Sequence, residues 1–176
     1  MRVLNTIGYE LTSIGDFITA LQGAGVGCVI DVRAVPVSRK AGFSKKALSR
    51  FLADSGIGYQ HIPGLGNPKP GRDAARAGQL ADFKKIYRAH LKTADAQRGF
   101  ELAADVAATV NACLLCYERD PEICHRSLVA KKLSLERGFS IENLVVQEGL
   151  STVLPDGSRK SPYPGESPAA TEQAVW

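Results

Sequence analysis

The chain contains 176 residues, of which 44% are hydrophobic and 23% are charged, proportions typical of a globular domain with a sizeable core. No apolar run approaches the length of a membrane-spanning helix, which argues against a protein that crosses a membrane. The formal net charge of +4 is too small to indicate a nucleic-acid-binding protein by itself.

Strand and helix patterns alternate in the first part of the chain. They predict, in chain order, a strand at 2–7, a helix introduced by Ser13, a strand at 28–32, a helix capped by Ser44 and ended by Gly56, and a strand at 57–62. The second strand, Cys-Val-Ile-Asp-Val, is rich in β-branched residues and is therefore expected to be buried.

The second part of the chain begins with residues 63–78, whose prolines and glycines predict a long irregular loop. There follow, in chain order, helices at about 79–92 and 98–109, a strand at 112–116, a helix from Asp120 and Pro121 to Gly138, and a strand at 144–146. This alternation predicts a single three-layer α/β domain over residues 1–150, with a mainly parallel sheet of about five strands. Residues 151–176, rich in proline, serine and glycine, predict a weakly ordered tail.

Chemically reactive residues follow four of the predicted strands. They are Thr6, Gly8 and Tyr9 after the first, Asp31 and Arg33 at the second, Tyr59 and His61 at the third, and Cys116, Glu118 and Arg119 after the fourth. Because all strands of a parallel sheet end at one edge, we expect these groups to share one crevice there. Asp31 and Arg33 face the same side of a strand, and a structural ion pair is as compatible with them as a role in the site.

Basic residues are concentrated in one segment. Residues 33–50 contain six of them and no acidic residue: Arg33, Arg39, Lys40, Lys45, Lys46 and Arg50. A local surface of this kind attracts phosphates or carboxylates, although a solvated lysine-rich helix face would give the same pattern.

The four cysteines are expected to be reduced. Asn5 and Thr6 interrupt the apolar start that an export signal would need, so we expect a cytoplasmic location. Cys113 and Cys116 have the spacing of a metal knuckle, but on a strand residues three apart face opposite sides. We therefore expect Cys113, like Cys28, to lie in the core.

Cys124 is expected near the amino terminus of a helix, where the helix dipole and Arg126 would favour its thiolate. The same helix end could bind an anion through free backbone amides. Adjacent Cys124 and His125 point in different directions on a helix, so we do not expect both to bind one metal ion. A site formed by Cys116, Cys124 and His61 is the alternative, with no fourth ligand evident.

Four ordered motifs give the chain a resemblance to a known family. They are Thr6-Ile-Gly-Tyr-Glu, Asp31-Val-Arg-Ala-Val-Pro-Val-Ser-Arg39, Tyr59-Gln-His-Ile-Pro-Gly-Leu-Gly66 and Cys116-Tyr-Glu-Arg-Asp-Pro-Glu-Ile-Cys-His-Arg126. Together they resemble the bacterial and archaeal "domain of unknown function 488" family, from about residue 5 to 147. The resemblance implies the fold and the position of a site, with motif positions at Thr6, Gly8, Tyr9, Asp31, Arg33, Pro36, Ser38, Arg39, His61, Gly66, Cys116, Glu118, Cys124, His125 and Arg126.

A weaker similarity is to rhodanese-like domains, through Val-Ile-Asp-Val-Arg and a strand-Cys-loop-Arg-helix unit. Those domains have a tight loop of a few residues between cysteine and helix. Here a longer connection containing Asp120 and Pro121 follows Cys116, which argues against sulfur transfer and phosphatase chemistry.

Three functions are compatible with these features. The first, which we favour, is binding of or action on nucleic acid or a phosphorylated small molecule such as a nucleotide. Its phosphate would be held by Arg33, Arg39 and Arg126, with Thr6, Gly8, Tyr9, Ser38, His61 and Gly66 as further substrate-binding candidates. The catalytic candidates are Glu118 or His125 as general acid or base, Asp31 as the group that orients a partner, and Cys124.

The second function is thiol chemistry, such as sulfur transfer, at Cys124 or Cys116. The third is a non-catalytic module in which these cysteines and His61 hold zinc or iron.

Overall fold

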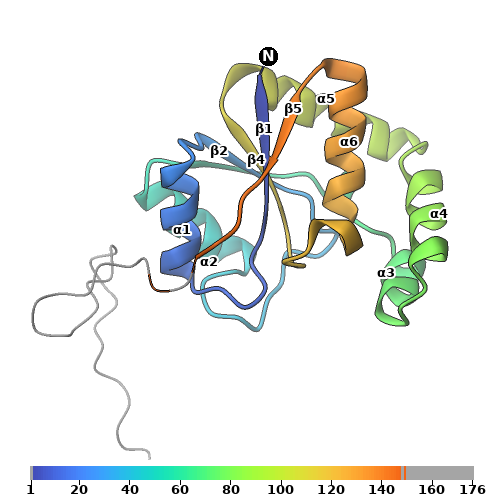
Figure 1. The fold of residues 1–176 in the computed structure, drawn as a ribbon, viewed down its shortest axis with the longest axis horizontal. Coiled ribbons are helices and arrows are strands. Elements are labelled where there is room, and N and C mark those ends of the chain that lie inside the picture. Colours follow the sequence, from blue (N-terminus) through green and yellow to red (C-terminus); the bar gives the residue numbers. More distant parts are fainter. Residues whose placement is uncertain (1, 148, 150–176) are drawn as a thin grey trace, which may run out of the picture.

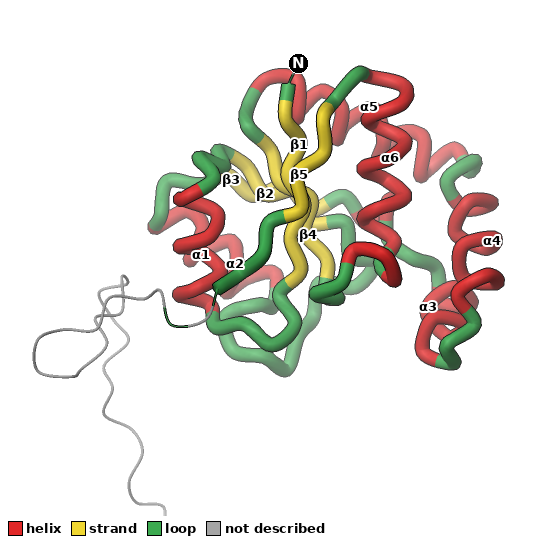
Figure 2. Tube along the Cα trace, viewed as in Figure 1, coloured by secondary structure: helices red, strands yellow, loops and turns green. Residues whose placement is uncertain are grey.

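The computed structural model describes residues 2–147 and 149, and the predicted tail at 151–176 lies outside the described residues. The described chain forms a three-layer α/β domain with an all-parallel sheet of five strands between two groups of helices (Figure 1), which confirms the predicted fold class. The strands are β1 (Val3–Gly8), β2 (Cys28–Asp31), β3 (Gly58–His61), β4 (Ala112–Cys116) and β5 (Ser140–Asn143). Their spatial order is β3-β2-β4-β1-β5, with the strands in the middle of the molecule (Figure 2).

The helices divide between the two faces of the sheet. Helices α1 (Ile14–Gly23) and α2 (Lys45–Asp54) cover one face. The other face is covered by α3 (Lys69–Arg76), α4 (Leu80–His90), α5 (Ala94–Thr109) and α6 (His125–Arg137). None of the helices in the described ranges combines the length and apolar character needed to span a membrane.

Strand β4 shows how the sequence fills both cores. All five of its residues are buried, and alternate side chains enter opposite clusters. Leu114 and Cys116 pack with the helices of the α6 face, whereas Cys113 packs with those of the α1 face. The prediction that Cys113 and Cys116 face opposite sides is therefore confirmed. Cys28 is only half-buried, because its neighbour across the sheet is Gly58, which has no side chain to cover it.

Three predicted elements differ from the observed ones. The segment 63–78 is not irregular throughout, because it contains a single-turn 3-10 helix, η1 (Pro63–Leu65), and α3. Its prolines stand at helix starts, where a missing amide donor breaks no helical hydrogen bond. The last strand, β5, lies at 140–143 and not at the predicted 144–146. It is an edge strand whose last two residues are exposed, so a continuous apolar run does not mark it. The predicted helix from Asp120 is a separate turn, η2 (Pro121–Ile123), followed by α6.

The connections after the strands diverge around β4. The chain leaves β1 and β2 toward α1 and α2, on one face, and leaves β4 toward α6, on the other. Because β4 lies between β2 and β1, its carboxyl end is a topological switch point, the place where open α/β sheets bind their ligands.

Candidate metal centre at the end of strand β4

Four side chains with metal-binding atoms meet where β4 ends and α6 begins. They are Cys116, Glu118, Cys124 and His125, and one donor atom of each lies within 4.8 Å of those of the other three. The Cys116 and Cys124 sulfurs lie 3.1 and 2.9 Å from Glu118 Oε2, and Cys116 Sγ lies 3.6 Å from His125 Nδ1. A tetrahedral zinc ion would separate such atoms by about 3.3–3.8 Å, so the observed spacing needs little adjustment to receive one.

The local backbone explains why the four residues converge. Asp120 caps η2 by accepting a hydrogen bond from the Glu122 amide, and this turn brings the chain back beneath the end of β4. Cys124 then has an extended backbone, with φ −108° and ψ 141°, and is the N-cap of α6. The expectation that Cys124 and His125 point apart is therefore wrong, because it placed both inside a helix.

The carbonyl of Val32, directly after strand β2, sets the orientation of His125. His125 Nε2 lies 2.8 Å from the Val32 carbonyl oxygen, to which it can only donate, so in the neutral ring Nδ1 keeps its lone pair on the side of Cys116. Metal-binding histidines are oriented in this way in most proteins. The Tyr87 ring packs edge-on against the His125 ring, with centroids 5.1 Å apart. Sequence reasoning missed both Val32 and Tyr87, because a backbone carbonyl and a core tyrosine carry no motif.

Burial and hydrogen bonds shift the pKa values of the four side chains in the cluster. Burial raises the pKa of the Cys116 and Cys124 thiols, so the metal-free thiols are protonated, contrary to the thiolate expected at Cys124. Burial also raises the pKa of Glu118, but hydrogen bonds from Cys124 and Cys116 outweigh it and leave that pKa below its usual value. For His125, burial lowers the pKa and the contact with Cys124 raises it, with a net increase.

Arg126 is a structural residue of this site. It is 1% exposed, and its guanidinium donates to Thr6 Oγ1 and to the carbonyl oxygens of Glu118 and Arg119. Gly8 touches the same loop, since a Cβ atom there would lie 1.9 Å from the Glu118 carbonyl oxygen. Thr6, Gly8 and Arg126 thus hold the loop after β4 in place.

A second polar network lies at the ends of β2 and β3. Asp31 and Arg33 form a buried ion pair of 2.6 Å, as one of the two interpretations of their spacing predicted. The Asp31 carboxylate also accepts from the Tyr59 hydroxyl, and Arg33 donates to the Tyr9 hydroxyl and the Phe43 carbonyl. Burial, then the bond to Asp31, raises the pKa of Tyr59.

His61 belongs to this second network. Its Nε2 lies 2.9 Å from the Arg33 carbonyl oxygen and its Nδ1 lies 3.4 Å from Lys45 Nζ. The structure does not bring His61 together with Cys116 and Cys124: the residues that meet there are Cys116, Glu118, Cys124 and His125.

The remaining candidates lie in the loop after β2 or against it. Ser38 accepts from the Lys40 amide, and Arg39 is exposed. Gly66 is buried against Ala34, where a Cβ atom would lie 2.2 Å from the Ala34 Cα.

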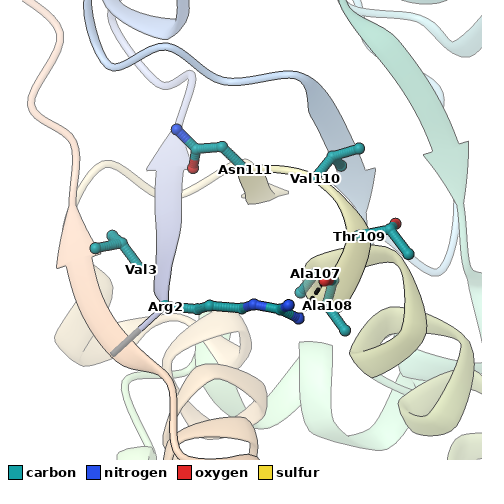
Figure 3. Close-up of a pocket in the computed structure, with 7 residues that line it drawn as sticks. All are labelled: Arg2, Val3, Ala107, Ala108, Thr109, Val110 and Asn111. Carbon is teal, nitrogen blue, oxygen red and sulfur yellow. Dashed lines mark hydrogen bonds between the residues drawn. The ribbon is translucent and has the colours of Figure 1, made fainter.

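Two grooves of the described structure lie far from these residues. One, of about 290 Å³, is lined by Arg2, Val3 and residues 107–111, at the amino ends of β1 and β4 (Figure 3). Arg2 extends across it and donates to the Ala108 carbonyl. The other shares Arg2 and continues toward Phe139. An anion pocket at the carboxyl ends of the strands therefore stays a prediction.

The fold and the cluster define a parallel α/β domain with a candidate metal centre at its topological switch point. The family described as "Domain of unknown function DUF488" matches residues 13–133, and the chain belongs to this family. Three of the four sequence motifs lie inside the matched residues, and the first, at 6–10, precedes them. No curated protein and no solved structure matches the chain.

Proposed function

We propose that this protein binds a zinc ion through Cys116, Glu118, Cys124 and His125. The observation that carries the proposal is the convergence of their four donor atoms within 4.8 Å. Two thiolates, an imidazole and a carboxylate are ligands of zinc in proteins, and thiolates disfavour magnesium and calcium.

The hydrogen bonds of the metal-free cluster support the proposal. Both thiols donate to Glu118 Oε2, so their protons occupy the space between the donor atoms. An ion in this space would replace the thiol protons, and the buried thiolates would then be balanced by its charge. The orientation of His125 by Val32 is already that of a ligand.

The proposal is tested by the metal content of the full chain purified without chelators. We expect about one zinc per chain, and at least about a tenfold loss of affinity in Cys116→Ser and Cys124→Ser, measured by competition with a chromophoric chelator. Cys28→Ser is the matched control, because Cys28 is half-buried and lies outside the cluster. The site would be refuted if folded wild-type protein took up no stoichiometric zinc. It would also be refuted if Cys28→Ser lost as much zinc affinity as Cys116→Ser and Cys124→Ser.

A second candidate function, binding of the phosphates of nucleic acid or a nucleotide, is supported by the basic segment at 33–50. Arg39, Lys45, Lys46 and Arg50 are exposed, and α2 begins at Lys45, beside His61. Arg33 and Arg126 are buried and donate to protein atoms, so we assign phosphate binding to the exposed residues instead.

The double variant with Arg39→Ala and Lys45→Ala tests this second candidate function. We expect several-fold weaker binding of a labelled single-stranded oligonucleotide, and a salt dependence reduced by about one unit of slope per charge removed. Arg98→Ala, an exposed arginine of α5, is the matched control. Competition by a mononucleotide separates the two ligands, and equal affinity in wild type and double variant contradicts the candidate.

A further inference from the structure

We infer that Glu118 is an exchangeable ligand of the proposed zinc site, which Cys116, Cys124 and His125 hold permanently. Water or a small anion would take the fourth coordination position when the carboxylate leaves. This inference rests on the proposed function and adds to it a binding position for an external ligand.

The four ligands differ in their access to solvent. Cys116, Cys124 and His125 are only 3%, 1% and 5% exposed. Glu118 is half-buried, the least enclosed of the four. Of the four ligands, Glu118 is therefore the one that an external ligand would displace with the least disturbance of the core.

The loop that carries Glu118 is held by several contacts, whereas the Glu118 residue itself is only half-buried. Arg126 binds the carbonyl oxygens of Glu118 and Arg119, the Arg119 amide donates to Glu10, and Gly8 packs against the Glu118 carbonyl. Exchange thus needs only side-chain rotation, and the loop keeps its place. The other ligands cannot rotate away in this manner, because the core encloses them.

The charge and number of ligands favour the exchange. Two cysteines and one histidine with an open fourth position are a ligand set of catalytic zinc sites. Their two thiolates neutralise a divalent ion, and Glu118 adds one negative charge in excess. In the exchange one zinc–carboxylate bond breaks and one bond to water or an anion forms, with no change of oxidation state.

The experiment uses the full chain loaded with cobalt(II), whose visible spectrum reports the coordination, and sodium azide as the probe ligand. Glu118→Ala should retain one equivalent of metal. It should bind azide at least about tenfold more tightly than wild type, because no carboxylate has to be displaced. Glu122→Ala, in the neighbouring turn η2, is the matched control and should behave as wild type.

The outcomes separate the two proposals. If wild type takes up no metal, the proposed function fails and this inference with it. If wild type holds one equivalent but Glu118→Ala loses it, Glu118 is a permanent ligand and only the inference fails. Metal retention in Glu118→Ala with an azide response no stronger than that of wild type overturns the inference as well.

Discussion

Gly8 lies so close to the loop after β4 that it has no room for a side chain. A Cβ atom would lie 1.9 Å from the Glu118 carbonyl oxygen and 3.0 Å from the Arg119 Cα, both on a loop that Arg126 holds. We therefore expect Gly8→Ala to lower the free energy of unfolding by about 1–3 kcal/mol, the usual cost of overpacking, and to weaken zinc binding by shifting the loop that connects Cys116 to Cys124. Urea denaturation and chelator competition measure the two effects.

Gly23→Ala is the control for this substitution. Apart from its chain neighbours and the backbone of its own helix, no atom lies within 4 Å of a Cβ placed on Gly23, which is the last residue of α1. Its free energy of unfolding should stay the same or rise by up to about 1 kcal/mol, because alanine favours a helix. Equal stability and zinc affinity of both variants would show that the contact between Gly8 and the loop does not constrain the site.

Single residues also show how far the sequence predicts chemistry. The spacing of Asp31 and Arg33 predicts that they face one side, and they do pair. The spacing does not predict that Tyr59, Tyr9 and the Phe43 carbonyl form hydrogen bonds with this pair, because these partners come from other parts of the chain. Asp31 and Arg33 are thus hydrogen-bonded to protein atoms, and a role for them in a ligand site stays a prediction.

At the scale of elements, helices and strands with a regular apolar period were predicted well. Strand β4 was predicted at its observed bounds, and Ser13 caps α1 through its side chain. The errors occur where local polar chemistry decides the backbone. Asp120 and Pro121 do start a helical turn, but it ends after Ile123, and the extended Cys124 that follows changes which side chains meet.

At the scale of the whole molecule, the sequence predicts that reactive groups gather at one edge of a parallel sheet. It does not predict which of them touch, because the strand order β3-β2-β4-β1-β5 follows from tertiary packing. That order places His61 on the edge strand β3, away from the cysteines, and brings Val32 next to His125. From the sequence, Cys116 and Cys124 were named as possible metal ligands, whereas Glu118 and His125 were named only as acid or base candidates. Grouping these four residues required the fold.

The proposed ion would join the end of β4 to the start of α6, and so would couple metal binding to the stability of the whole domain. An ion that binds only the folded state adds about 2.7 kcal/mol to the free energy of unfolding when its free concentration is 100 times its Kd. For a domain of this size we expect Tm to rise by about 5–10 °C with zinc and to fall back with a chelator. Differential scanning calorimetry of wild type and Cys124→Ala measures the effect. A zinc-induced rise of the same size in Cys124→Ala would show that the ion stabilises the protein from elsewhere, because the variant lacks one of the two buried thiolates that the site requires.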